Sequence, residues 1–276
     1  NVIVSEDKEP QFKKSSLVRV PIRLGADAFV SGIISEQNTN RMIDAIEAFK
    51  LLMKVHGVKT YKACATSAMR EASNGKEVVE KIHRKTGVQI DIIGGKEEAK
   101  IISSTDLNQL IEGNNSYLYV DVGGGSTEIT LFSKGKLITS KSFKMGTVRL
   151  LNNKKSTNKE MFSNVEKWIK KNTKNIKKVC LIGSGGNINK LFKMSGRTEG
   201  KPISYIYLNA QYQFLKQMSF NERISELSLN PDRADVIIPA TKIYLSAMKW
   251  SGARKIYVPK IGLSDGIIKS LFYNKF

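Results

Sequence analysis

The stretch Asp121-Val122-Gly123-Gly124-Gly125-Ser126-Thr127-Glu128 says most about how this chain folds. The apolar run 117–122 predicts a strand that leads straight into three glycines, and a second strand is expected from Glu128 to Phe132. Three glycines permit left-handed backbone conformations and let the backbone approach a ligand, because no Cβ stands in the way. Successive amides in such a turn can surround a phosphate. The stretch therefore predicts a phosphate-binding loop between two strands.

Two acids flank these glycines. Asp121 stands at the end of the first strand and Glu128 lies beyond the turn, where both can hold a divalent metal, directly or through water. The alternative is a tight hairpin that needs glycine only for its geometry. Two glycines would be enough for such a hairpin and the acids would have no role, so the pattern favours phosphate.

A second glycine-rich turn is Gly183-Ser184-Gly185-Gly186-Asn187, which follows a strand predicted from Lys178 to Ile182 and opens a helix. Amides at a helix start can bind an anion, although many strand-to-helix turns use glycine for geometry alone. Ile188 stands where a dinucleotide fingerprint needs its third glycine, which disfavours that reading. The sequence also lacks a G-x-x-x-x-G-K-[ST] motif, which disfavours a Walker-type ATPase.

The remaining pattern alternates strands with helices. Apolar residues at helical spacing predict a helix that Ser35 caps and Gly57 ends. The alternation implies an α/β fold with a parallel sheet covered by helices. Further strands are expected at 58–66, 88–93 and 137–143, further helices at 77–85 and 97–112, and a mostly helical tail interrupted by Pro231, Pro239 and Pro259.

The length of 276 residues exceeds what one core usually organises, so two domains are expected. The polar segment Gly113-Asn114-Asn115-Ser116 reads as a linker. It predicts an N-terminal domain over residues 1–113 and a C-terminal domain over residues 114–276.

Two further segments carry candidate site residues. Arg70 follows a predicted strand, where a guanidinium is well placed to pair with phosphate. A surface arginine at a helix start is an equal alternative. Glu97 and Glu98 follow two glycines at another helix start, where adjacent carboxylates usually serve as partners of the helix dipole.

Charge and composition narrow the class of protein. Lys and Arg number 45 against 25 Asp and Glu, a formal net charge of +20 that attracts anions without saying which. No apolar run approaches the roughly 18–20 residues that span a bilayer, and the amino terminus lacks a signal-peptide pattern. Cys64 and Cys180 are expected to be buried thiols in a reducing cytoplasm. With two cysteines and two histidines, a zinc site is disfavoured.

A basic segment follows the predicted strand at 137–143. The interpretation that needs no binding role is that such a charge run forms the solvent-exposed face of a helix. The alternative is that the segment holds the distal length of a polyanionic polymer. Its lysines are Lys154, Lys155, Lys159, Lys167, Lys170, Lys171, Lys174, Lys177 and Lys178.

Taken together, these motifs resemble the exopolyphosphatase and guanosine pentaphosphate phosphohydrolase family. The resemblance rests on ATSAMREA, IIGGKEEAK, YVDVGGGSTEI, KMGTVRL, IGSGGNI and PKIGLSDGII, in this order, and it covers nearly the whole chain. It implies the actin-like superfold shared with sugar kinases and the Hsp70 ATPase, with two ribonuclease H-like α/β domains flanking a cleft. It also implies hydrolysis of a terminal phosphoanhydride bond of polyphosphate or guanosine pentaphosphate.

The resemblance assigns roles residue by residue. Glu98 matches the catalytic carboxylate that activates water, and Asp121 and Glu128 match the positions that bind Mg²⁺ or another divalent cation. A cytoplasmic location is implied, and a homodimer is left open. The phosphate-binding positions are Arg70, Gly123, Gly124, Gly125, Ser126, Gly183, Ser184, Gly185, Gly186 and Asn187.

One departure and two alternatives accompany this reading. The family begins with a strand and a D-x-G-S-N-S loop, which the sequence from Asn1 onward does not contain. Either the natural start lies before Asn1, or the protein has lost this loop, in which case catalysis would be in doubt. An ATP-dependent kinase or ATPase of the same superfold is the first alternative. A polyanion binder without catalysis is the second, although the sequence carries no recognisable nucleic-acid-binding motif.

Overall fold

The computed structural model describes residues 1–276 except 1, 6–9, 104, 106–114, 260 and 274–276. The chain forms two compact units: unit 1 is Asn1–Ile93 with Ile267–Phe276, and unit 2 is Gly94–Gly266. The division between the units follows Ile93, because the helix after Ile93 packs against strands of unit 2. The expected linker itself falls mostly outside the described residues, so that boundary stays a prediction.

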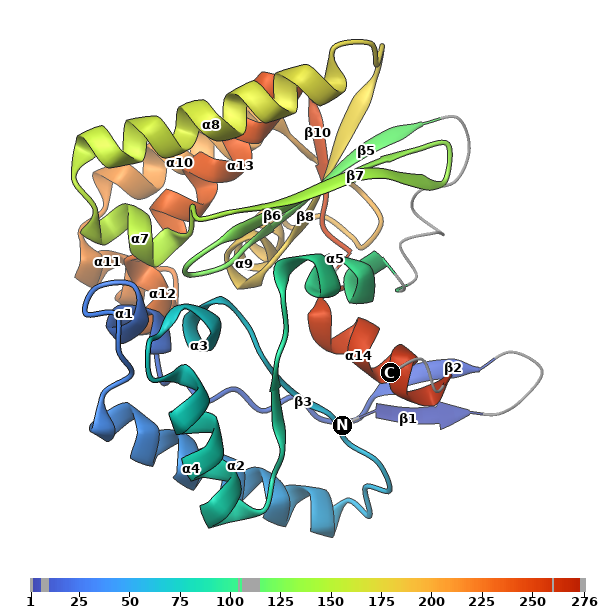
Figure 1. The fold of residues 1–276 in the computed structure, drawn as a ribbon. Helices are drawn as coiled ribbons and strands as arrows, with labels where there is room; N and C mark the ends of the chain where they lie inside the picture. Colours follow the sequence, from blue (N-terminus) through green and yellow to red (C-terminus); the bar gives the residue numbers. More distant parts are fainter. Residues whose placement is uncertain (1, 6–9, 104, 106–114, 260, 274–276) are drawn as a thin grey trace. The chain divides into compact units, whose positions relative to one another are not determined.

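Within the described residues, unit 2 is built on a six-stranded mixed sheet of order β7-β6-β5-β8-β10-β9 (Figure 1). β5 pairs antiparallel with β6, and β6 pairs antiparallel with β7. On its other side β5 pairs in parallel with β8, which pairs in parallel with β10. The bounds are β5 (Ser116–Val122), β6 (Thr127–Ser133), β7 (Lys136–Phe143), β8 (Val179–Ser184), β9 (Ile203–Ser204) and β10 (Lys255–Tyr257).

The side chains of β5 alternate between two apolar clusters on the two faces of the sheet. Leu118 and Val120 belong to the larger cluster, whereas Tyr119 belongs to a smaller one that includes Ile102. Because Asp121 continues this alternation, it lies on the same face as Tyr119, at the carboxyl end of the strand. The sheet therefore presents a carboxylate at the point where the glycine loop begins.

Helices cover both faces of this sheet. α13 packs against β5 and β8 and also contacts α8, α9 and α10, whereas α5 packs against β6 and β7. None of the described helices combines the length and the apolar content that crossing a bilayer needs. The bounds are α5 (Gly95–Ser103), α7 (Thr147–Asn152), α8 (Lys155–Thr173), α9 (Gly186–Met194), α10 (Tyr205–Gln217), α11 (Phe220–Ser225), α12 (Pro231–Ala234) and α13 (Ile237–Ser251).

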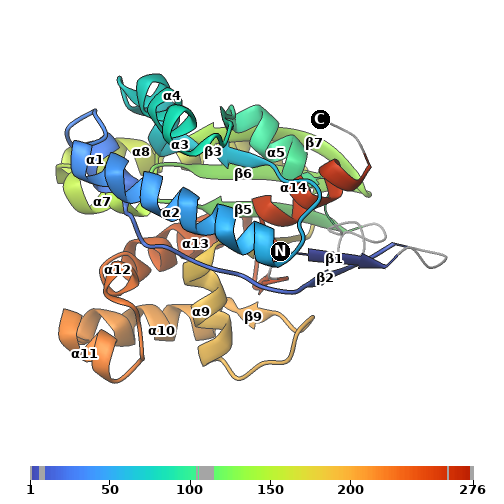
Figure 2. The ribbon, with the colours of Figure 1, turned by 90° about the horizontal axis from the view of Figure 1, so that it is seen from below.

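Unit 1 contains two separate two-stranded sheets within the described residues. β1 (Val2–Ser5) and β2 (Gln11–Lys14) form an antiparallel pair, and β3 (Ala63–Ala65) pairs in parallel with β4 (Ile90–Ile92). The helices α2 and α4 lie side by side (Figures 1 and 2). The helix bounds are α1 (Leu24–Ala28), α2 (Glu36–Val55), α3 (Ser67–Glu71), α4 (Gly75–Thr86) and α14 (Leu263–Phe272), the last of which crosses from unit 2 into unit 1.

Several local predictions are confirmed. The Ser35 hydroxyl accepts a hydrogen bond from the Asn38 amide at 3.2 Å and caps α2, and Gly57 follows that helix with a φ of 60°. The strands expected at 128–132 and 137–143 are β6 and β7, and the turn between them has positive φ at both Lys134 and Gly135, as a tight hairpin requires. The expected parallel pairing in the first part of the chain is present between β3 and β4.

Other local predictions were wrong. The strands expected at 58–66 and 88–93 pair over only 3 residues each. Pro239 does not interrupt a helix, because it lies in the first turn of α13, where no intrahelical donor is lost. Cys64 and Cys180 are half-buried rather than buried. The helix expected at 97–112 begins at Gly95, and most of its expected second half lies outside the described residues.

Candidate functional site

Four polar residues form a row across adjacent strands of unit 2. The strand registers pair Ser142 of β7 with Glu128 of β6, Glu128 with Asp121 of β5, and Asp121 with Ser184 of β8. Directly paired residues of neighbouring strands share one face of a sheet. The row therefore brings both predicted metal residues and one predicted phosphate residue together on the face that holds Tyr119.

The row places two carboxylates on adjacent strands. Glu128 is buried, and the Ser142 hydroxyl donates a hydrogen bond to its Oε1 at 2.8 Å. Burial raises the pKa of Asp121 to about 7, the charge of Glu128 acts in the same direction, and contacts with the hydroxyls of Ser184 and Tyr119 oppose the rise. A positive charge beside the two carboxylates would oppose the rise in the pKa of Asp121.

These residues fit a weakly held magnesium ion. Within the described part of the chain, no group of three or more His, Cys, Asp or Glu side chains is placed to hold a metal. Mg²⁺ usually keeps several waters and binds through one or two carboxylates plus substrate phosphates. Asp121 and Glu128 supply that number, so such an ion would be completed by the substrate.

The glycine loop lies between β5 and β6 and rests on the start of α7. The Gly123 amide closes the loop by donating to the Ser126 carbonyl at 3.0 Å, and the Thr147 amide donates to the Gly123 carbonyl at 3.0 Å. The amides of Gly124, Gly125 and Ser126 donate to no acceptor among the residues that the structure describes. Three successive donors are thereby left for an anion or for solvent.

The expected reason for the glycines was wrong in part. None of the three loop glycines has a positive φ, so left-handed conformations do not explain them. A Cβ on Gly146, at the start of α7, would lie 2.3 Å from the Gly124 carbonyl oxygen, which shows how closely the two segments approach. The Arg149 Nε adds a bond of 2.7 Å to the Gly125 carbonyl. Close backbone packing therefore shapes the loop.

The second glycine turn meets the first at Asp121. Gly185 joins β8 to α9 with a φ of 115°, a conformation that favours glycine. A Cβ added there would lie 3.1 Å from the Val122 carbonyl and 3.5 Å from the Asp121 Oδ1. The following residue, Gly186, accepts a hydrogen bond of 3.1 Å from the Arg233 Nη1.

Glu98 is held against the same face of the sheet. Its helix α5 packs on β6 and β7, and a Cβ on Gly95 would lie 2.9 Å from the Ser142 Cβ. Glu98 stands one turn beyond Gly95 and one turn before the buried Ile102, so these three residues share one side of the helix. Glu98 is buried, whereas the neighbouring Glu97 is exposed. This difference favours a site role for Glu98 over a role as a partner of the helix dipole.

Arg70 is the predicted site residue that belongs to unit 1. It lies in α3, and its Nη1 donates to the Ile93 carbonyl at 2.5 Å. This bond anchors the guanidinium to the end of the β4 segment. The phosphate-contacting role of Arg70 stays a prediction.

Sequence reasoning missed four residues that shape the site. Gly146 and Arg149 lay inside a motif that was noticed, KMGTVRL, but without assigned roles. Ser142 could have been suggested by its position opposite Glu128 once the hairpin turn was placed. Tyr244, which contacts the second glycine turn, gave no local signal because it lies 60 residues after that turn.

A model of the Ppx/GppA phosphatase family matches residues 3–275. A bifunctional 3-dehydroquinate synthase/phosphatase of Fusobacterium nucleatum is 27% identical over 265 residues, which are 86% of this chain and 39% of that protein. Exopolyphosphatase 1 of Mycobacterium tuberculosis is 27% identical over 115 residues, covering 42% of this chain and 33% of that protein. The chain thus spans about two fifths or less of the length of these curated relatives.

Solved structures agree on the fold. An exopolyphosphatase from Cytophaga hutchinsonii superposes with a TM-score of 0.86 at 21% identity, covering 99% of this chain and 94% of that chain. An Aquifex aeolicus member of the Ppx/GppA family gives a TM-score of 0.73 at 22% identity, with the same coverage. These likenesses confirm the predicted fold class of two actin-like α/β domains.

Proposed function

Because this chain belongs to the Ppx/GppA phosphatase family, we propose that it hydrolyses the terminal phosphoanhydride bond of inorganic polyphosphate or guanosine pentaphosphate. The observation that carries this proposal is the polar row of Ser142, Glu128, Asp121 and Ser184. The row ends beside a loop in which three amides have no acceptor among the described residues. The loop offers donors to a phosphate, and the row offers carboxylates to its counter-ion. Both are fixed on one sheet.

The glycine loop binds and orients the terminal phosphoryl group. The amides of Gly124, Gly125 and Ser126 donate hydrogen bonds to its oxygens, and the start of α9 contributes further amides from the second glycine turn. Donors that are fixed before the substrate arrives need no reorganisation during the reaction. Phosphoryl transfer depends mainly on such positioning and charge stabilisation.

Glu98 acts as the general base for the attacking water molecule. Its carboxylate accepts a proton from a water molecule as the water oxygen attacks the terminal phosphorus. The bond between that phosphorus and the bridging oxygen breaks, and the shortened chain or nucleotide leaves with the bridging oxygen. The burial of Glu98 keeps its carboxylate away from competing solvent.

We propose that Asp121 and Glu128 hold Mg²⁺. When bound, the ion neutralises charge that develops on the phosphate oxygens. A cation shared with Glu128 would offset the burial and the carboxylate repulsion that raise the pKa of Asp121 to about 7. The cytoplasmic location and the homodimer that the resemblance allows stay predictions.

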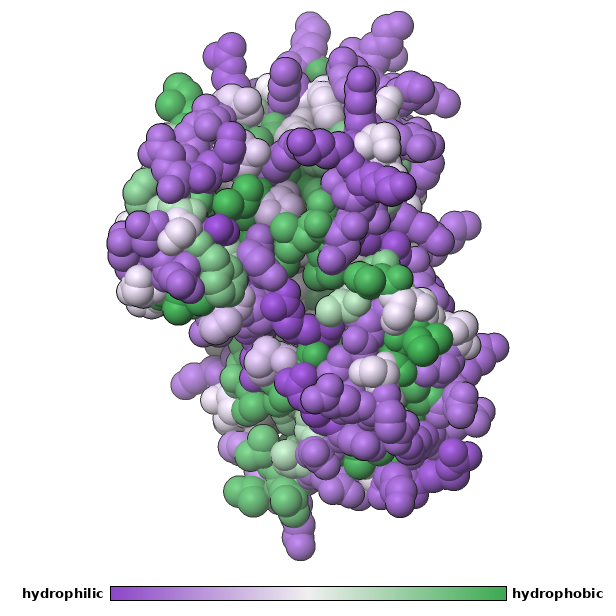
Figure 3. Space-filling view, turned by 90° about the vertical axis from the view of Figure 1, so that its left-hand side faces the viewer, coloured by the Kyte–Doolittle hydropathy of each residue, from purple (hydrophilic) through white to green (hydrophobic). Residues whose placement is uncertain are grey.

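The surface of α8 favours a polymer over a nucleotide. All nine lysines of the basic segment are exposed, and among the residues that the structure describes only Lys170 of this set forms an ion pair, with Glu166 at 2.6 Å. Val165 and Ile169 are buried on the opposite side of the helix. Long hydrophilic side chains project from the upper edge of unit 2, where α8 lies (Figure 3). A polyanionic chain would release counter-ions on such a face, as nucleic acid does.

The test measures phosphate release from long-chain polyphosphate, guanosine pentaphosphate and ATP, each with Mg²⁺ and with a chelator. We expect release from the first two only with Mg²⁺. Release from ATP alone would replace the proposal by the ATPase alternative. Binding of polyphosphate without any release would replace it by a polyanion binder.

A further inference from the structure

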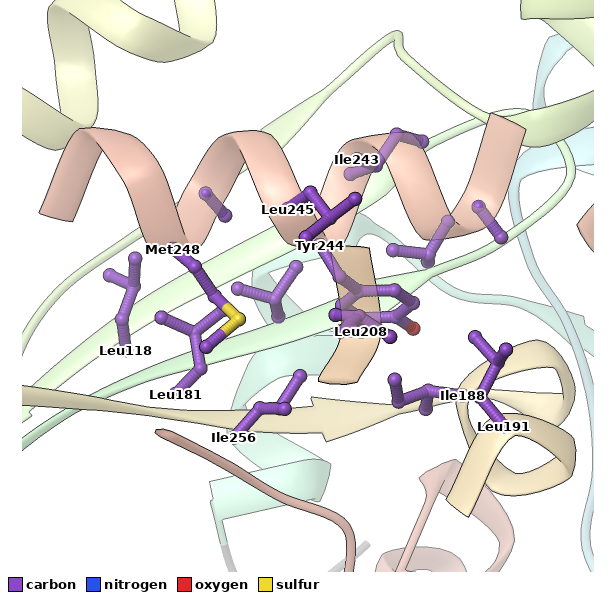
Figure 4. Packing of buried hydrophobic residues seen from close by; sticks show 14 of the residues in the cluster. Leu118, Leu181, Ile188, Leu191, Leu208, Ile243, Tyr244, Leu245, Met248 and Ile256 are labelled. Carbon is purple, nitrogen blue, oxygen red and sulfur yellow. The ribbon is translucent and has the colours of Figure 1, made fainter. Parts of the chain in front are cut away.

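Tyr244 places a hydroxyl at the end of an apolar core. It lies in α13, is fully buried, and has Ile243, Leu245 and Met248 as apolar neighbours along the helix. Figure 4 shows its ring pointing from α13 toward the sheet, with the oxygen on the side of Ile188. A buried hydroxyl requires a hydrogen-bond partner, and that of Tyr244 donates to the Ser184 carbonyl.

The carbonyl that it contacts belongs to the second glycine turn. Ser184 ends β8 and is paired with Asp121 in the sheet register. Around Gly185 three groups converge: a Cβ there would lie 3.1 Å from the Val122 carbonyl, 3.4 Å from the Tyr244 hydroxyl and 3.5 Å from the Asp121 Oδ1. The hydroxyl therefore reaches the point where the turn, the end of β5 and the candidate metal residue meet.

We propose that Tyr244 is a positioning residue of the phosphate site. Its hydroxyl fixes the orientation of the Ser184–Gly185 peptide, and thereby the distance between the start of α9 and Asp121. The packing of α13 does not need the oxygen, because phenylalanine fills the same volume. The inference rests on the proposed function, since it concerns the same site, but the position of the turn can be measured without substrate.

A matched variant separates positioning from plain stability. Thr241 lies on the same helix, is equally buried, and donates to the Ile237 carbonyl of its own helix at 2.7 Å. Tyr244→Phe and Thr241→Val each remove one buried hydroxyl without a large change of shape. Both should lower Tm by about 2–4 °C, the scale of one lost hydrogen bond in a chain of this size.

Only the Tyr244 variant should change the site. We expect Tyr244→Phe to lower kcat/KM for polyphosphate about tenfold, the scale of one misplaced contact in an active site, and to raise the Mg²⁺ concentration that gives half-maximal activity. Thr241→Val should change neither quantity. A Tyr244→Phe variant with unchanged kcat, KM and Mg²⁺ requirement would overturn the proposal.

Hydrogen exchange distinguishes failure of this inference from failure of the proposed function. The Asn189 amide donates to the Gly185 carbonyl at 3.2 Å and closes the first turn of α9. It should exchange about tenfold faster in Tyr244→Phe than in the parent or in Thr241→Val. If the parent releases no phosphate, the proposed function fails. The exchange rate of the Asn189 amide then decides by itself whether the Tyr244 hydroxyl holds the turn. Equal exchange in all three proteins would show that the hydroxyl does not hold the turn.

Discussion

Unit 2 and unit 1 differ in how their strands are joined. In unit 2 the antiparallel strands β6 and β7 and the parallel strands β8 and β10 are connected through β5, which pairs with β6 and with β8. In unit 1 the antiparallel pair β1–β2 and the parallel pair β3–β4 share no strand within the described residues. β5 is also the strand that carries Asp121 into the glycine loop. The candidate site residue Asp121 therefore lies on β5, the strand that joins the antiparallel and the parallel strands of unit 2.

The two units also differ in the size of their apolar cores. The buried apolar cluster of unit 1, which includes Met69, Ile82 and Ile90, is smaller than the main cluster of unit 2. A pocket of about 680 Å³ opens at the surface of unit 1. Arg70 therefore belongs to a unit with a smaller apolar core than the unit that carries Glu98, Asp121 and Glu128.

The largest expected effect tests whether unit 2 carries the chemistry. Glu98→Gln keeps the size of the side chain but removes the proton acceptor, so kcat should fall about 10²-fold or more, with substrate binding retained. Glu97→Gln, one residue earlier and exposed, is the matched control and should behave like the parent. Phosphate release assays on both variants decide, and a Glu98→Gln enzyme with near-normal turnover would remove Glu98 from the mechanism.

The next effect concerns the support of the glycine loop. In Gly146→Ala the added methyl would overlap the Gly124 carbonyl, which lies 2.3 Å from the Cβ position. We expect at least about a tenfold loss in kcat/KM, because displaced donors no longer match the phosphate. Gly262→Ala is the control, since among the described residues its methyl would meet only the Ser184 Oγ, at 3.9 Å. Equal activity of the two variants would mean that the loop tolerates displacement.

A third prediction addresses the two units directly. The Ile93 amide of unit 1 donates to the Ala65 carbonyl at 3.0 Å and should exchange with solvent at least about tenfold faster than the central amides of β5, because regions with fewer buried apolar contacts open at lower free energy. Hydrogen exchange followed by mass spectrometry measures both in one sample. Similar protection in the two sheets would contradict this effect of the smaller core.

The fourth prediction uses pH. The folded pKa of Asp121, about 7 against an ordinary 3.8, means that the folded state keeps a proton that the unfolded chain releases between those values. The contribution of Asp121 to stability is thus lost as pH rises from 4 to 7. Asp121→Asn does not titrate, so its Tm advantage over the parent should grow across that range to about 8 °C at pH 8.

Mg²⁺ should reduce the Tm advantage of Asp121→Asn over the parent. Added Mg²⁺ is expected to raise the Tm of the parent at pH 8 more than that of Asp121→Asn, because a ligand stabilises only the form that binds it. Differential scanning calorimetry at pH 4, 6 and 8, with and without Mg²⁺, gives all the values. A Tm difference that does not change with pH would show that Asp121 titrates normally.

The smallest effect concerns the surface of unit 2. Replacing Lys167, Lys170, Lys171 and Lys174 by Gln should raise KM for long-chain polyphosphate about threefold and flatten its dependence on salt, because fewer counter-ions are released. KM for guanosine pentaphosphate should stay the same. The control replaces four exposed lysines of unit 1, Lys54, Lys59, Lys76 and Lys85. Equal salt slopes in both variants and the parent would identify the α8 face as ordinary surface.

The sequence by itself determined the local elements and the family. Periodicity placed α2 between Ser35 and Gly57, and the break from apolar residues to three glycines placed the loop after β5, because these signals are read within a few neighbouring residues. The ordered motifs identified the family and pointed to Glu98. The lengths of β3 and β4 were overestimated, since an apolar run shows only that a segment can pair and not where its partner ends.

Only the tertiary structure decided how these pieces meet. The row from Ser142 to Ser184 exists because of strand registers, and a register is fixed by contacts between segments far apart in the chain. Gly146 is required by the approach of another backbone, Tyr244 reaches Ser184 across 60 residues, and burial shifts the pKa of Asp121. Burial and close approach belong to the packed molecule, and no short stretch of sequence carries them.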